Sequence, residues 1–247
     1  MIRAADYLAL AAKLPEIELG QLTGGRGVIV VAPHPDDESL GCGGLIAACC
    51  AHGIDVRLLV LSDGTGSHPS SQSYPAARLC TVRESEVKAA ASILGLPELA
   101  ITCLRLRDGS VPVAGPLFAR AAATIRDRTI EIGAASVVVT WRHDPHCDHQ
   151  AAFAIAREAV AGLEGVRLLA YPIWGWNLPD DAMLDETGPK GGRLAIGPYL
   201  DRKRAAIRAH RSQVSALIDD DPAGFRLAPE MLARFDRAHE IFIVCPA

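Results

Sequence analysis

The sequence predicts one α/β domain built on an open, mainly parallel sheet with helices on both faces. Between residues 28 and 171, apolar runs typical of strands alternate about five times with segments whose apolar residues recur at helical spacing. The strand-like runs are almost continuously apolar, as in sheets that are covered on both faces. With 247 residues, 49% of them hydrophobic, the chain is long enough to bury one large core. These observations predict a Rossmann-like fold.

The predicted domain spans 1–247, with a core at about 27–213, an N-terminal helix and connector in 1–26 and a C-terminal extension in 214–247. Apolar periodicity predicts a leading helix over 3–14 that packs against the core. The core elements then expected are a strand over 28–32, a helix over 39–51, a strand over 54–61, a helix over 78–94, a strand over 101–106, a helix over 115–131, a strand over 135–141, a helix over 148–162 and a strand over 166–171.

Two polar or irregular segments interrupt this rhythm. Residues 62–76 form a loop too long for a simple turn between strand and helix, and loops of that size are usually functional or mobile. Residues 171–198 are rich in aromatics, Pro and Gly, and we expect them to be irregular and to cover a pocket. Beyond them the sequence predicts a helix over 200–209, a short helix over 229–237 and an edge strand over 241–244.

Composition excludes several classes of protein. The net charge of −4 and the pI near 6.1 give no basic surface for nucleic acid, so we expect no DNA or RNA partner. No run approaches the roughly 18 apolar residues of a membrane span, and the first residues do not resemble a signal peptide, so we expect a soluble, cytoplasmic protein. Seven cysteines without a C-x-x-C pair favour reduced thiols over disulfides. A homo-oligomer is left open.

Residues capable of chemistry concentrate at the ends of two predicted strands. The strand over 28–32 runs directly into His34, Asp36, Asp37 and Glu38, and the strand over 135–141 runs into the segment Arg142–His149. In open α/β sheets, ligands bind outside the carboxyl ends of the strands. If these two strands are neighbours, their side chains converge on one site.

The residue types at these strand ends suit a catalytic metal. His34 and Asp37, three residues apart, together with a histidine from the other strand end would supply two imidazoles and one carboxylate, and that set leaves one coordination position open, as in catalytic zinc sites. Asp36, beside the ligands, could take a proton from the water that the metal activates. His146 could donate a hydrogen bond to a developing oxyanion or protonate a leaving amine.

Other interpretations of these residues are weaker. Residues 35–38 could only cap the next helix, and His143 or His146 could be solvated loop residues. However, three of the eight histidines fall within seven residues, and both clusters occupy the same kind of junction between strand and helix.

A nucleotide-binding protein or methyltransferase is suggested by the glycines of 41–44 and by Asp63, but Ile46 occupies the third glycine position of that fingerprint. A sugar-binding module without catalysis is disfavoured because Asp36, the candidate base, is present.

The motifs resemble the LmbE-like, or PIG-L, family of zinc-dependent N-acetylglucosaminyl deacetylases. The resemblance rests on the segments 34–38 and 146–149, with further matches at Arg83-Glu84, at 107–109 and at 210–213. By resemblance, His34, Asp37 and His149 bind zinc, Asp36 is the general base, and His146 stabilises the oxyanion or acts as the acid. Arg83 and Asp108 match positions that contact the substrate sugar in some members.

The resemblance also has departures. Cys147 stands where many members have Pro, and its thiol is an alternative ligand that the spacing of the neighbouring histidines disfavours. A Tyr that some members place shortly before this motif is replaced by Asp144-Pro145. Trp174 and Trp176 could stack on a sugar or belong to the local core.

The resemblance implies hydrolysis of an N-acetyl group from a small molecule that contains N-acetylglucosamine. It implies one zinc ion per chain, with another divalent metal as the alternative. A zinc amidohydrolase acting on another N-acyl amine is the second candidate. The sequence does not identify the group attached to the sugar, which would enter a pocket rimmed by 62–76 and 171–198.

Overall fold

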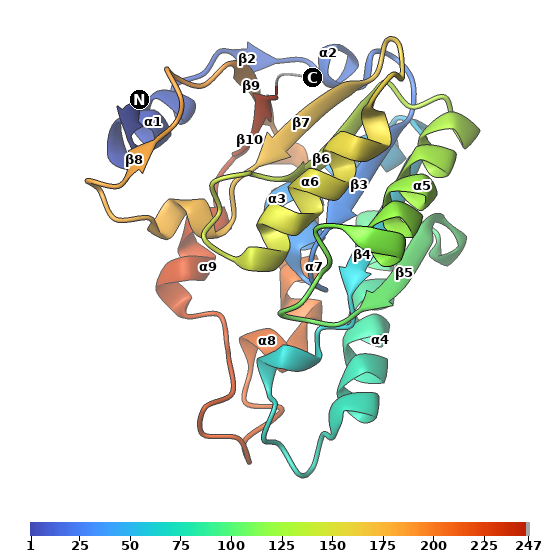
Figure 1. Cartoon of the computed structure of the whole chain (residues 1–247), viewed down its shortest axis with the longest axis vertical. Helices are drawn as coiled ribbons and strands as arrows, with labels where there is room; N and C mark the ends of the chain where they lie inside the picture. Colours follow the sequence, from blue (N-terminus) through green and yellow to red (C-terminus); the bar gives the residue numbers. More distant parts are fainter. Residues whose placement is uncertain (246–247) are drawn as a thin grey trace.

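The computed structural model describes residues 1–245 and places most of its strands in one sheet. Within that part of the chain, the sheet has eight strands in the order β2-β9-β10-β7-β6-β3-β4-β5 (Figure 1). Its parallel half consists of β3 (Val28–Ala32), β4 (Val56–Ser62), β5 (Ile101–Leu106), β6 (Ser136–Thr140) and β7 (Arg167–Tyr171). The predicted open, mainly parallel α/β sheet is therefore confirmed.

The other half of the sheet is mixed. Strand β10 (His239–Val244) pairs antiparallel with β7 on one side and with β9 (Gly191–Ala195) on the other. Strand β2 (Glu16–Ile17) lies parallel to β9 at the edge. The prediction of an edge strand over 241–244 was wrong, because β9 covers that edge. Strand β9 begins with two glycines and an arginine, a composition that does not predict a strand, so we expected the segment 171–198 to be irregular.

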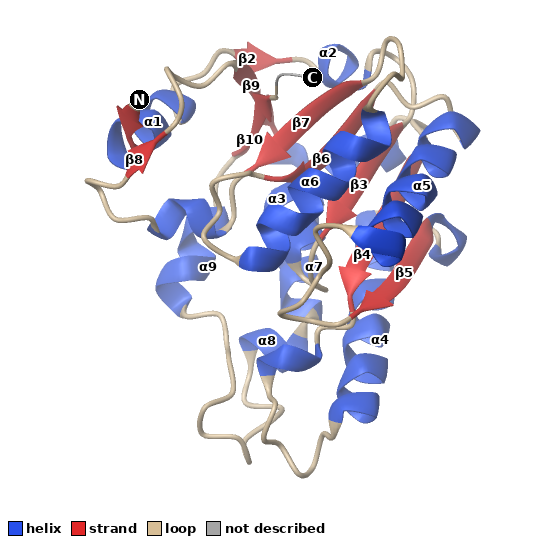
Figure 2. Ribbon diagram, viewed as in Figure 1, coloured by secondary structure: helices blue, strands red, loops and turns tan. Residues whose placement is uncertain are grey.

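Helices cover both faces of the sheet, as predicted (Figure 2). One layer consists of α3 (Asp37–Ala51), α4 (Ala76–Leu94) and α7 (Leu200–Ala209), and the other of α5 (Gly115–Glu131) and α6 (Cys147–Val160). The side chains of β3 alternate between these layers: Val28 and Val30 belong to the first core, and Ile29 and Val31 to the second. All four are fully buried, which explains why the strand is apolar throughout.

The glycines of α3 allow close packing of the helix against its neighbours. A Cβ at Gly41 would lie 2.1 Å from Cδ2 of Tyr171, and a Cβ at Gly44 would lie 2.5 Å from Cγ2 of Ile196. Glycine at these positions lets the helix approach β7 and the segment after β9. The N-terminal turn of α3, which carries Asp37, is thereby held against the sheet.

Several shorter elements complete the described part of the chain. A small separate sheet pairs β1 (Ile2–Arg3) with β8 (Met183–Leu184). The remaining helices are α1 (Ala4–Ala11), α2 (Leu19–Thr23), α8 (Arg211–Val214) and α9 (Pro229–Phe235), and the 3-10 turns are η1 (Thr65–Ser67), η2 (Glu98–Ala100), η3 (Trp174–Asn177) and η4 (Gly197–Tyr199). No helix within 1–245 is long and apolar enough to cross a membrane.

Two loops distant in sequence lie side by side at the lower end of the molecule in Figure 1. The carboxylate of Asp220 accepts hydrogen bonds from the hydroxyl of Ser71 at 2.6 Å and from the backbone N–H groups of Gln72 and Ser73 at 2.9 and 2.7 Å. This carboxylate ties the long loop 62–76 to the segment 215–228. Phe225 and Leu227, which belong to the segment 215–228, line the cavity that is described next.

Candidate functional site

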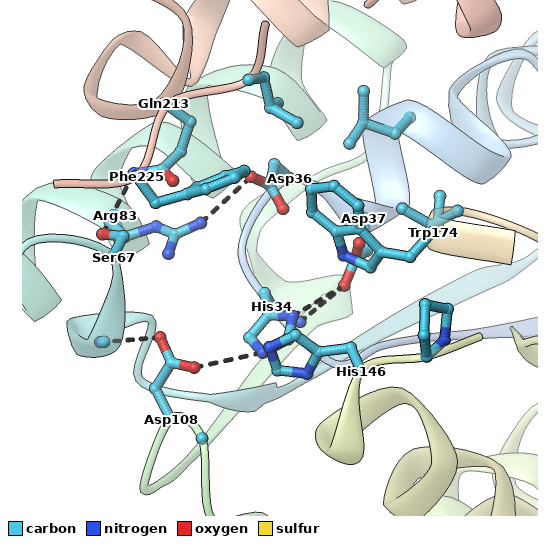
Figure 3. Close-up of a pocket in the computed structure, with 16 residues that line it drawn as sticks. His34, Asp36, Asp37, Ser67, Arg83, Asp108, His146, Trp174, Gln213 and Phe225 are labelled. Carbon is cyan, nitrogen blue, oxygen red and sulfur yellow. Dashed lines mark hydrogen bonds and ion pairs between the residues drawn. The ribbon is translucent and has the colours of Figure 1, made fainter. Parts of the chain in front are cut away.

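The strands that carry the two predicted clusters are neighbours in the sheet. Strand β3 pairs directly with β6 in parallel register, with Val30 opposite Val138. From β3 the chain proceeds to β4 and β5 on one side, whereas β6 and β7 lie on the other, so the strand order reverses between β3 and β6. Crevices at such switch points are the usual ligand sites of open α/β sheets. His34, Asp37 and His146 meet there (Figure 3).

Three of the predicted ligand atoms form a nearly equilateral triangle. Nδ1 of His34, Oδ2 of Asp37 and Nε2 of His149 are each 3.3 Å from the other two. Tetrahedral zinc with bonds of about 2.0–2.1 Å to nitrogen would place its ligand atoms about 3.3–3.4 Å apart. The spacing and the chemistry of this donor set therefore fit a zinc-sized divalent ion.

Both imidazoles are oriented by carboxylates on their far sides. Nε2 of His34 lies 3.1 Å from Asp148 and 3.2 Å from Asp108, and Nδ1 of His149 lies 2.9 Å from Asp144. Histidines that bind a metal commonly donate their second N–H to a carboxylate, which fixes the tautomer and the ring orientation. Here this arrangement leaves Nδ1 of His34 and Nε2 of His149 facing Asp37.

Asp144 and Asp148 are functional neighbours that the sequence interpretation missed. Asp144 accepts N–H groups from residues 173, 174 and 175, and Asp148 accepts those of Gly109 and Val111 at 2.7 and 2.9 Å. Both are fully buried. Their only sequence signal was their position within the histidine-rich segment, since their partners come from distant loops.

The three residues of the triangle are buried and charged, and they shift one another's pKa values. Although burial alone would lower the pKa of His34, hydrogen bonds to Asp108, Asp148 and Asp37 raise it well above its usual value. Burial likewise opposes the charge of His149, but Asp37 and Asp144 raise the pKa of its imidazole to about 9. The same histidines hold the pKa of Asp37 far below its usual range, against the effect of burial. The pocket thus favours positive charge at its centre.

Asp36 adopts a backbone conformation that L-residues rarely adopt, with φ 131° and ψ −30°. Such strain, about 1–3 kcal/mol, persists only where the surroundings impose it. The guanidinium of Arg83 donates to the backbone carbonyl of Pro35 and lies 3.2 Å from the carboxylate of Asp36. Burial, together with the charge of Asp37, raises the pKa of Asp36 to about 7 although Arg83 opposes the shift.

A buried ion pair supports the same turn from the other side. Glu38 accepts the backbone N–H of Asp36 at 3.0 Å, and its second oxygen accepts hydrogen bonds from His210 at 2.8 Å and from Ser39 at 2.7 Å. Both Glu38 and His210 are fully buried. Burial would raise the pKa of Glu38, but the charge and hydrogen bond of His210 lower it. The sequence pointed to the segment 210–213 only as a family match, and its role as a support for Asp36 was not foreseen.

His146 is the N-cap residue of α6 and lines the cavity beside the triangle. Its ring centroid is 4.6 Å from that of His34 and 5.2 Å from that of His149. Nδ1 accepts the backbone N–H of Asp148 at 3.2 Å, so the neutral ring carries its proton on Nε2. Burial, followed by the charges of His34 and His149, lowers the pKa of His146. These effects favour the neutral ring, which can donate a hydrogen bond from Nε2.

The cavity around these residues has a volume of about 470 Å³, within the usual range for small-molecule sites. All of the predicted site residues except the fully buried His149 line it, including Arg83 and Asp108. A polar part adds Gly66, Ser67 and Gln213, and an apolar part consists of Leu40, Pro145, Ile173, Trp174, Phe225 and Leu227. Trp176 lies outside this cavity and packs against the core, with the guanidinium of Arg237 5.2 Å from its ring centroid.

Other groupings of potential ligands are less suited to a metal. His146, Cys147 and Asp148 bring ligand atoms within 4.8 Å of one another, but the oxygens of Asp148 already accept two backbone N–H groups and face His34. The thiol of Cys147 is exposed and lies 3.7 Å from the carbonyl of Gly109. All seven cysteines are free, and Cys42 and Cys49 are the fully buried ones.

The structure defines an α/β protein that has two histidines and a carboxylate at the switch point of its sheet, in an arrangement able to hold a metal ion. The profile of the family described as PIG-L, GlcNAc-PI de-N-acetylase, matches residues 29–160. The chain belongs to this family.

Relatives of the chain support this assignment. A probable N-acetyl-alpha-D-glucosaminyl L-malate deacetylase 2 of Bacillus anthracis is 28% identical over 79% of this chain and 84% of its own length. The diacetylchitobiose deacetylase of Thermococcus kodakarensis is 30% identical over 76% of this chain and 70% of its own.

Among solved structures, the N,N'-diacetylchitobiose deacetylase of Pyrococcus horikoshii superposes with a TM-score of 0.66 at 20% identity, covering 90% of this chain and 84% of that one. This similarity shows a common fold.

Proposed function

We propose that the protein is a metal-dependent hydrolase that removes the N-acetyl group from a small molecule containing N-acetylglucosamine. The observation that carries this proposal is the triangle of Nδ1 of His34, Oδ2 of Asp37 and Nε2 of His149, whose 3.3 Å edges match a tetrahedral ion. Family membership and the names of the relatives supply the substrate class.

His34, Asp37 and His149 would hold one zinc ion per chain, or another divalent metal of similar size. When bound, the ion supplies Lewis acidity that polarises an amide carbonyl and makes water a better nucleophile. The buried carboxylates behind both histidines keep their free nitrogens directed at the site. These outer residues make the ligand set rigid before any ion arrives.

Asp36 is the proposed general base. Its carboxylate lines the cavity beside Asp37, and Arg83 holds one of its oxygens at 3.2 Å. The carboxylate would take a proton from the attacking water and pass it to the departing amine. The strained backbone conformation directs the side chain of Asp36 into the cavity, where it can act as a base, whereas the side chain of the next residue, Asp37, is one of the proposed metal ligands.

His146 is the proposed oxyanion donor. Its neutral ring carries a proton on Nε2, which would stabilise the negative oxygen that develops on the amide carbon. Asp108 is proposed to accept a sugar hydroxyl, since it lines the polar part of the cavity. Arg83 is closely engaged with Asp36 and with the carbonyls of Pro35 and Gly64, so its proposed contact with the sugar is secondary to orienting the base.

The second candidate function is hydrolysis of another N-acyl amine by the same residues, because the triangle and the base carry no information about the sugar. A mass-spectrometric panel of N-acyl amino sugars and simple N-acyl amines, incubated with zinc-loaded protein, separates the two. We expect a mass loss of one acetyl group from the N-acetylglucosaminides. Intact amino sugars together with a cleaved non-sugar amide would contradict the sugar deacetylase and favour the second candidate.

A further inference from the structure

The apolar part of the cavity has its own architecture. Trp174 and Phe225 meet edge to face, with ring centroids 5.5 Å apart and an interplanar angle of 71°. Neither ring is fully buried, and 38% of Phe225 is exposed. Figure 3 shows Trp174 on the side of Asp37 and His146, and Phe225 beside Arg83. An aromatic pair that lines a cavity and remains partly exposed offers a surface to an apolar ligand group.

Both rings are positioned through their backbones by residues of the site. The N–H of Trp174 donates to Asp144, the same carboxylate that orients His149. The N–H of Phe225 donates at 2.6 Å to the carbonyl of Ser67, which also lines the cavity. Both aromatic residues are therefore held by residues of the candidate site, although they are about fifty residues apart in sequence.

The described lining of the cavity provides no free basic side chain for an anionic ligand group. Asp36, Asp37 and Asp108 contribute three carboxylates, and Arg83 is the only arginine or lysine among the described lining residues. Arg83 is 2% exposed, and its terminal nitrogens are occupied by Gly64, Pro35 and Asp36. The part of the cavity around Trp174 and Phe225 therefore offers an anionic group no free guanidinium or ammonium, and burying a charge without such a partner is costly.

From these observations we propose that the amino sugar of the substrate carries an uncharged, apolar aglycone, which binds against Trp174 and Phe225. This inference rests on the proposed deacetylase function and specifies its substrate class. It sets the chain apart from the relative whose name includes L-malate, since malate is a dicarboxylate. The enzyme that supplies the substrate must therefore be one that joins an N-acetylglucosaminyl group to an apolar acceptor.

The first test measures binding without turnover. Zinc-loaded protein is titrated calorimetrically with phenyl glucosaminide and with methyl glucosaminide, which are already deacetylated. Contact with an aromatic pair is expected to make the phenyl compound bind about 2- to 12-fold more tightly. The variant Phe225→Ala should lose this preference and remain folded, because Phe225 is partly exposed. Equal affinities in the wild type would overturn the inference.

Trp176→Ala is the matched control for Trp174→Ala. Both residues lie in the 3-10 turn η3, but the ring of Trp176 is outside the cavity. We expect the phenyl preference to fall in Trp174→Ala and to persist in Trp176→Ala. Loss of the preference in both variants would indicate that the turn as a whole is disturbed, and would remove Trp174 as a determinant.

A second test uses turnover and separates the possible failures. Acetate release is compared for phenyl, methyl and malyl N-acetylglucosaminides, and for methyl glucosaminides with longer N-acyl groups. The inference predicts the highest kcat/KM for the phenyl compound and the lowest for the malyl compound. A malyl preference, or a gain that follows acyl length instead, would overturn it while the deacetylase function stands. If no compound releases its acyl group but phenyl binding persists, the proposed function fails and the apolar subsite remains.

Discussion

The strained turn at Asp36 yields a prediction whose size follows from its contacts. Glu38 supplies the acceptor for the N–H of Asp36 and is itself held by His210. Hydrogen bonds to charged groups contribute about 1.5–3 kcal/mol. If Glu38→Ala withdraws that amount from the strained conformer, the equilibrium ratio of conformers with Asp36 aimed into the cavity to conformers with it turned away falls about 10- to 150-fold. We therefore expect kcat to fall by up to that factor while KM changes little.

The assay is steady-state acetate release together with the zinc content of each variant. Glu38→Gln keeps an oxygen that can accept the N–H of Asp36, so it should recover most of the lost kcat. Glu240→Gln is the control, since Glu240 is also a buried carboxylate and pairs with Lys203 at 2.7 Å but does not contact Asp36. A folded, zinc-loaded Glu38→Ala protein with the wild-type kcat would refute the supporting role.

Three further perturbations test the roles of Asp36, His146 and His68. Asp36→Ala should retain its zinc and lose turnover by several orders of magnitude, as elemental analysis and a rate assay would show. His146→Ala should reduce kcat by about 10²–10³, the usual effect of losing one oxyanion donor, and a smaller effect on kcat than on KM would argue against that role. The pKa of His68 is lowered by burial, so the folded state resists its protonation, and stability should fall as the pH drops below the ordinary value of about 6.5. Urea unfolding at pH 7.5 and 5.5 should show a weaker pH dependence in His68→Asn, and an unchanged dependence would remove His68 as the cause.

The sequence predicted the parallel half of the sheet and the elements that carry the site because its signals there are local. Strand β3 is buried on both faces and hence uniformly apolar, and helices α3 and α6 follow directly from their strands. Parallel topology then brings the carboxyl ends of β3 and β6 to one edge. Residues 34–38 and 146–149 could therefore be assigned to one site without knowledge of the register.

The missed features depend on long-range partners. Strand β9 is short, contains two glycines and exists because β10 pairs with it in antiparallel register. Asp144 acquires its role from the backbone of 173–175, about thirty residues away, and Glu38 acquires its partner His210 from 172 residues away. Phe225 reaches the cavity because Asp220 fastens its loop to the segment 71–73. Local periodicity contains no information about such pairings.

The proposed function requires one ion on His34, Asp37 and His149 for removal of an acetyl group from an amino sugar. This requirement is tested by a titration of zinc into chelator-treated protein, with acetate release from methyl N-acetylglucosaminide as the readout. We expect activity to rise to a plateau at one zinc per chain, and no zinc-dependent activity in His149→Ala. Full acetate release by the stripped wild-type protein, or an unaltered titration in His149→Ala, would contradict it.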